Sequence, residues 1–101
     1  MDRFELIKYL ESFRLKCSEK GRHLTEICVE DAFPGDASTS YIIRIKAPWV
    51  DKMYCSDALD FLFDTLWETT SADVRKKVFS IRVLDSKDEL HCEQEASAVG
   101  V

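Results

Sequence analysis

The stretch CSDALDFLFDTLWE, residues Cys55 to Glu68, combines a helical apolar pattern with four acidic side chains and no basic one. A helix turns by about 100° per residue, which gathers the apolar residues of this stretch into one sector. These residues are Cys55, Ala58, Leu59, Leu62 and Leu66. The pattern predicts an amphipathic helix over residues 51–69 that packs its apolar side on a core.

The four acids of this stretch follow spacings of 3, 4 and 4 and therefore line the opposite side of the helix. They are Asp57, Asp60, Asp64 and Glu68. Like charges four residues apart each cost a few tenths of a kcal/mol, and negative charge near a helix C-terminus opposes the helix dipole. Between Asp51 and Asp73 the chain holds six acids and one base, so this segment alone carries the net charge of −5 of the whole protein.

Two interpretations of the acidic side remain open from sequence. Acidic helix faces in acidic proteins are commonly just solvated. Alternatively, the carboxylates steer and orient a basic protein partner while the neighbouring tryptophan supplies contact area. The predicted partner-binding residues are then Asp51, Asp57, Asp60, Asp64, Trp67, Glu68 and Asp73. The most concrete version is an immunity or inhibitor protein that neutralises a basic nuclease-type toxin.

The rest of the chain predicts one more helix and three strands. Residues 2–20 place Leu6, Leu10, Phe13 and Cys17 on one helical stripe, and Gly21 follows where a helix end favours glycine. Residues 24–31 and 41–47 alternate in polarity and predict a hairpin with a long loop around Pro34-Gly35-Asp36. In residues 78–84, we expect Phe79, Ile81 and Val83 to face the core.

This order, α-β-β-α-β, predicts an α+β fold in one small domain over residues 1–85. Two helices pack on one face of a three-stranded sheet, with Leu90–Cys92 as an optional fourth strand at the edge. Residues 86–101 have no clear period and predict a loosely ordered tail. On the open sheet face, opposite charges on neighbouring strands are expected to pair.

The element order and the Pro-Gly turn resemble the type II KH topology and the related BolA-like domains, over residues 2–84. The resemblance implies a nucleic-acid-associated module as the alternative function. Its contacts would come from Arg44, Lys46, Arg75, Lys76, Lys77 and Arg82. The G-x-x-G phosphate loop of KH domains is absent, and the stretch APWVDKMYCSD offers Cys55 where BolA-like proteins use a histidine.

Other classes of function have little support in the sequence. No apolar run is long enough for a membrane span, and the charged N-terminal stretch lacks a secretory core, so we expect a cytoplasmic protein. The four cysteines show no C-x-x-C spacing and are expected to be free thiols. Nucleotide-binding and hydrolase motifs are missing, and His23 and His91 have no zinc-site spacing. We therefore expect no catalysis, cofactor or metal, and the net charge of −5 does not favour a nucleic-acid partner.

Overall fold

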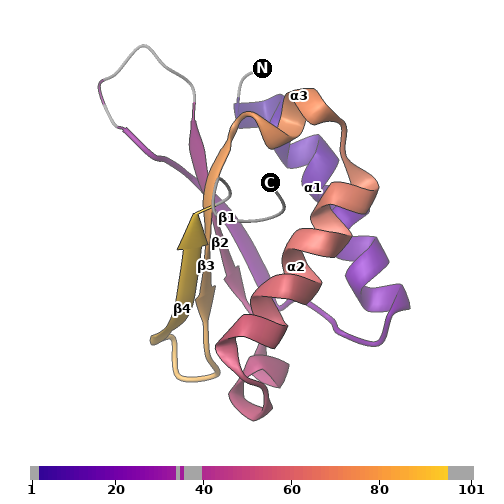
Figure 1. The fold of residues 1–101 in the computed structure, drawn as a ribbon, viewed down its shortest axis with the longest axis vertical. Helices are drawn as coiled ribbons and strands as arrows, with labels where there is room; N and C mark the ends of the chain where they lie inside the picture. Colours follow the sequence, from indigo (N-terminus) through magenta and orange to yellow (C-terminus); the bar gives the residue numbers. More distant parts are fainter. Residues whose placement is uncertain (1–2, 34, 36–39, 96–101) are drawn as a thin grey trace.

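The computed structural model describes residues 3–33, 35 and 40–95 as a helical layer on a four-stranded sheet (Figure 1). The helical elements are α1 (Arg3–Glu19), the 3₁₀ turn η1 (Pro48–Lys52), α2 (Cys55–Thr69) and α3 (Ala72–Arg75). The strands are β1 (Glu26–Asp31), β2 (Tyr41–Lys46), β3 (Val78–Leu84) and β4 (Leu90–Glu95). The predicted α+β class is confirmed, and α1 and α2 share one face of the sheet, as predicted.

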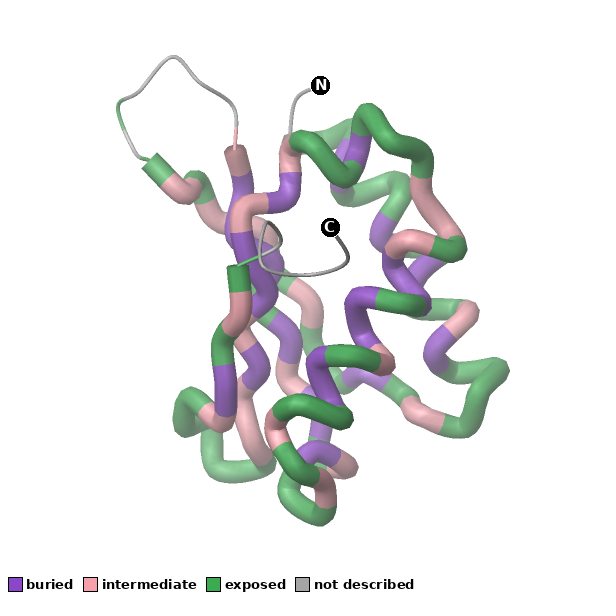
Figure 2. The backbone as a smooth tube through the Cα atoms, viewed as in Figure 1, coloured by how far each residue is buried: buried purple, intermediate pink, exposed green. Residues whose placement is uncertain are grey.

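The sheet is mixed and has the strand order β1-β2-β3-β4. The pairs β1–β2 and β3–β4 are antiparallel, whereas β2 and β3 are parallel because α2 and α3 form the crossover between them. The expected β1–β2 hairpin is thus confirmed, although most of its predicted Pro34-Gly35-Asp36 turn lies outside the described residues. The central strands β2 and β3 carry most of the buried positions of the sheet (Figure 2).

The optional fourth strand at Leu90–Cys92 is present as β4, and it corrects the prediction of a three-stranded sheet followed by a loose tail. It lies within residues 86–101, where the sequence predicted a loose tail, and it pairs with β3 from Leu84 to Ser80. A tight turn brings it back, in which the Asp85 carboxylate accepts hydrogen bonds from the backbone N–H groups of Lys87 and Glu89. Residues 86–95 therefore belong to the sheet, while residues 96–101 lie outside the described part of the chain.

A bulge changes the facing of the first residues of β3. The register shifts between Tyr41 and Ile42, so that Tyr41 pairs with Val78 and Ile42 with Ser80. Val78 consequently enters the core, and Phe79 packs edge-on against Phe33 at 5.1 Å between ring centroids. The prediction that Phe79 faces the core is wrong, because a bulged residue breaks the alternation on which it relied.

The end of α1 follows from a single glycine. Gly21 has φ +80°, and the N–H groups of Gly21 and Arg22 bond back to the carbonyls of Ser18 and Cys17. These two backbone hydrogen bonds close the last turn of the helix. They require Gly21 to adopt the left-handed conformation, which glycine adopts at little cost. The predicted core residues Leu6, Leu10, Phe13 and Cys17 are all buried.

Truncation tests the place of β4 in the fold. A chain ending at Asp85 loses the β3–β4 ladder and the buried Cys92, so we expect it to be less stable by several kcal/mol, at about 1 kcal/mol for each net hydrogen bond. A chain ending at Glu95 keeps every described strand and is the matched control. Urea unfolding followed by circular dichroism measures both. Equal midpoints for the two chains would mean that β4 contributes nothing to the fold.

Candidate functional site

The helix α2 begins four residues later than the sequence predicted. Pro48 starts the 3₁₀ turn η1, which anchors Val50 in the core and ends at Met53 in extended conformation. The α-helix then begins at Cys55, so Asp51 lies on η1 and not on α2. The apolar stripe itself begins only at Cys55, so it gave no evidence for extending the helix back to residue 51.

The two sides of α2 differ sharply in burial. Its inner side is fully or almost fully buried and holds Ala58, Leu59, Leu62, Phe63, Thr65 and Leu66. Its outer side holds Asp57, Asp60 and Asp64, all exposed. Of these three carboxylates, none has an ion pair or hydrogen bond with another residue in the described part of the chain. We call Asp57, Asp60 and Asp64 the acidic face.

Glu68 has the position predicted for it but is already paired. Its carboxylate accepts a hydrogen bond from the Lys20 ammonium at 2.7 Å and lies 3.6 Å from the Lys16 ammonium. The hydrogen bond from Lys20, and then the positive charges of Lys20 and Lys16, hold the pKa of Glu68 below its usual range. Glu68 therefore links α2 to α1, and its negative charge is largely balanced by Lys16 and Lys20 of the same molecule.

Asp51 is also engaged within the protein. Its carboxylate accepts hydrogen bonds from the hydroxyl of Ser86 at 2.5 Å and from the Ser86 backbone N–H at 3.2 Å. These bonds lower the pKa of Asp51 and connect η1 to the β3–β4 turn. Asp73 is exposed on α3, where it borders a shallow depression with Ser71, Lys76 and Lys77. Neither residue lies on α2, so the predicted seven-residue site does not form one surface element.

Trp67 lies half-buried at the border of the acidic face. Its ring packs against Phe63 at 5.5 Å and lies 5.5 Å below the Arg75 guanidinium, which also donates a 2.6 Å hydrogen bond to the Trp67 carbonyl. The ring therefore belongs partly to the core and partly to the surface. At the N-terminal end of the same helix, the N-cap residue Tyr54 is 81% exposed.

A cation–aromatic cluster on the other border was missed from sequence. The Arg22 guanidinium lies 4.4 Å from the Phe61 ring centroid and 5.6 Å from that of Trp49, and the two rings meet edge to face. Trp49 also donates a hydrogen bond from Nε1 to the His23 carbonyl at 2.9 Å. No local pattern indicated this cluster, because its members come from three separate segments.

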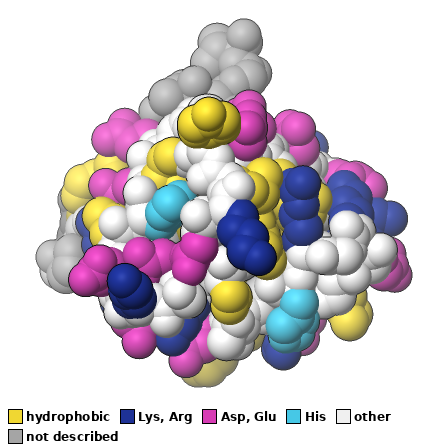
Figure 3. Space-filling model, turned by 90° about the horizontal axis from the view of Figure 1, so that it is seen from below, with side chains coloured by type: hydrophobic (Ala, Val, Ile, Leu, Met, Phe, Trp, Pro, Cys, Tyr) yellow, Lys and Arg dark blue, Asp and Glu magenta, His cyan; other side chains and the backbone are white. Residues whose placement is uncertain are grey.

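The basic residues of the alternative function are mostly paired. On the open sheet face, Arg44 pairs with Glu30 at 3.0 Å and Arg82 pairs with Glu93. Lys46 pairs with Asp88 at 2.6 Å. The predicted cross-strand pairing is thus confirmed. At the end of the molecule seen in Figure 3, Lys and Arg side chains are interspersed with Asp and Glu side chains. These pairs reduce the positive charge that the sheet offers to phosphates.

Metal and thiol chemistry find little support in the described residues. Within that part of the chain, no three His, Cys, Asp or Glu side chains gather closely enough to hold a metal ion. Cys17, Cys28, Cys55 and Cys92 are free thiols. Burial raises the pKa of Cys17 to about 11 and that of Cys92 to about 12, which disfavours the reactive thiolate. None of the described helices is long and apolar enough to cross a membrane.

Comparison with models of known protein families finds no match for this chain. Comparisons with curated proteins and with solved structures find no match either. The likeness in element order to type II KH and BolA-like domains therefore stays a prediction from sequence.

The Glu68 pairs predict a pH-dependent contribution to stability. Since pairing lowers the folded-state pKa of Glu68 from its ordinary 4.5, the contribution is complete above about pH 4.5 and is lost as the pH falls below it. We expect Glu68→Gln to lower the urea midpoint slightly at pH 7 and to lower it less at pH 3. The matched control is Asp64→Asn, which breaks no ion pair and should not lower the midpoint at pH 7. A Glu68→Gln effect of equal size at both pH values would contradict this assignment.

Proposed function

We propose that this chain is a small non-enzymatic protein that binds a basic protein surface through the acidic face of α2. The observation that carries the proposal is the contrast in pairing between this face and the charges of the open sheet face and around Glu68. Asp57, Asp60 and Asp64 are exposed and unpaired within the described residues, although charges on the sheet face and around Glu68 find partners. Carboxylates kept together at a cost are best explained by cations on another molecule.

The rigidity of the acidic face supports the same proposal. The three aspartates lie on a helix whose inner side is packed into the core, so their spacing is maintained without a partner. A preorganised charged surface loses little conformational entropy on association. Tyr54 and the exposed part of Trp67 add aromatic contact area near the two ends of α2. Glu68 and Asp51 contribute mainly by holding the helix and η1 in place.

The most concrete partner class is a nuclease-type toxin with a basic phosphate-binding site. Three carboxylates along one helix face can occupy cationic side chains that otherwise contact a phosphate backbone. The chain then acts as an immunity or inhibitor protein that competes with nucleic acid for the same cations. Charge steering would make association fast at low salt and slower as the salt concentration rises.

Charge reversal tests the acidic face directly. The wild-type chain is immobilised, partners are captured at low salt from an extract of the native host, and the affinity of each purified partner is measured by calorimetry. We expect Asp60→Lys/Asp64→Lys to weaken binding more than tenfold while the circular dichroism spectrum stays unchanged. Both aspartates are exposed and unpaired within the described residues, so the fold should tolerate the change.

The matched control is Glu89→Lys/Glu95→Lys, which changes the net charge equally at exposed positions off α2. It should bind within about threefold of the wild type, because rim charges remote from a contact affect mainly the association rate. Equal affinity of the wild type and the Asp60/Asp64 variant would remove the acidic face from the interface. A captured nuclease that stays fully active in the complex would exclude the inhibitor version alone.

A further inference from the structure

Helix α1 carries several large apolar side chains that the core leaves exposed. Of the seven large apolar side chains exposed in the described part of the chain, four belong to α1. They are Phe4 at 75%, Ile7 at 41%, Tyr9 at 40% and Leu15 at 64% exposed. The buried side of the same helix is complete without them. Exposed apolar side chains concentrated on one element commonly indicate an interaction surface.

The outer side of α1 has a regular composition along its length. Phe4, Lys8, Glu11 and Leu15 follow spacings of 4, 3 and 4 and therefore lie in one row, which we call the outer row. The row is apolar at both ends and charged in the middle. Lys8 and Glu11 are exposed, and neither has an ion pair within the described residues.

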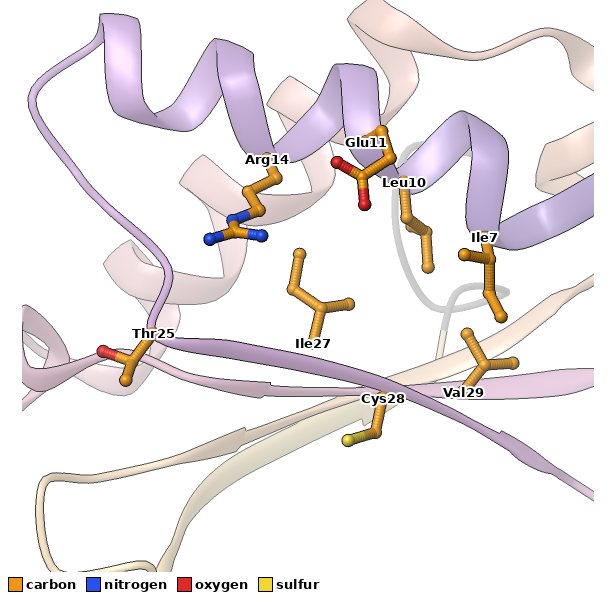
Figure 4. A pocket seen from close by; sticks show the side chains of 8 residues that line it. All are labelled: Ile7, Leu10, Glu11, Arg14, Thr25, Ile27, Cys28 and Val29. Carbon is orange, nitrogen blue, oxygen red and sulfur yellow. The ribbon is translucent and has the colours of Figure 1, made fainter. Parts of the chain in front are cut away.

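The outer row lies away from α2. Lys16 and Lys20 mark the flank of α1 that meets Glu68 of α2, and the row lies roughly 130° around the helix from this flank. It borders instead a groove of about 340 Å³ between α1 and the edge strand β1. In Figure 4, Ile7 and Leu10 descend from α1 toward Ile27 and Val29 of β1, while Cys28 points to the other side of the sheet.

We propose that the outer row binds the outer row of a second copy of this chain, with the two α1 helices antiparallel about a twofold axis. In this arrangement Phe4 lies opposite Leu15 of the second copy. Lys8 lies opposite Glu11, and by symmetry Glu11 lies opposite Lys8. The row is therefore self-complementary in both apolar character and charge.

Charge selects this orientation over the parallel one. A parallel pair would place Glu11 against Glu11 and Lys8 against Lys8, and like charges brought together at an interface are costly. The antiparallel pair instead forms two symmetric ion pairs flanked by apolar contacts. The contact area of a single helix pair is small, so a reversible monomer–dimer equilibrium is expected and not a permanent dimer.

The dimer is independent of the proposed function and compatible with it. Because the outer row and the acidic face lie on different helices and different sides, a dimer presents two acidic faces. Two linked sites raise the apparent affinity for a partner that carries two basic patches within reach. Loss of the dimer would leave each acidic face intact, so the two proposals fail separately.

Sedimentation equilibrium of the full chain over a wide concentration range is the first test. The weight-average mass should rise from 11.7 kDa toward twice this value as the concentration increases. A mass that stays at 11.7 kDa throughout overturns the proposal. If the chain stays monomeric and the outer row is instead required for binding another protein, or an extended peptide beside β1, the row has a different partner. That result also overturns the dimer proposal.

Charge exchange tests the orientation. Lys8→Glu and Glu11→Lys each place like charges opposite one another and should raise the dimer dissociation constant roughly tenfold or more. The double variant Lys8→Glu/Glu11→Lys restores the opposite charges and should restore the dimer. If the single variants leave the dimer dissociation constant unchanged, the dimer uses another surface. If the double variant does not restore the wild-type dissociation constant, the helices are not antiparallel. Either result contradicts the proposal. Circular dichroism confirms that each variant is folded.

Discussion

The burial of the inner side of α2 in the core that it shares with α1 and the sheet is the constraint on which the remaining structure depends. Leu62, Phe63 and Leu66 are fully excluded from solvent together with Ile43 and Ile81 of β2 and β3. Burial of each such side chain contributes about 1.5–3 kcal/mol, far more than the repulsion between neighbouring aspartates costs. The rotation of the helix is therefore set by its apolar side, and the acidic face must point outward whatever its electrostatic cost.

Charge pairing divides the surface into regions with different roles. On the open sheet face, cross-strand pairs neutralise the arginines, and between the helices Lys16 and Lys20 hold Glu68. Exposed pairs of this kind add little stability singly but help to set how the elements lie against each other. The acidic face of α2 and the outer row of α1 lack such pairs within the described residues. They are the two surfaces for which partners are proposed.

Much of the fold could be predicted from local patterns, and the errors have local causes. The stripes of α1 and α2 and the alternation of β1 and β2 each reflect one dominant buried side, which periodicity reads well. The start of α2, the facing of Phe79 and the strand β4 were misjudged. In each case a proline, a bulge or a tertiary contact overrode the periodic signal. Strand β4 has few apolar residues, and its pairing depends on the Asp85 turn and the exposed edge of β3.

The candidate site shows the same division. Sequence by itself determined that Asp57, Asp60 and Asp64 share the solvent side of a helix, because helical geometry and one apolar stripe leave no other position for them. Only the tertiary structure decided that Glu68 is paired with Lys16 and Lys20, that Asp51 bonds to Ser86 and that Trp67 is half-buried under Arg75. These contacts join residues far apart along the chain, so their distances exist only once the helices have packed on the sheet.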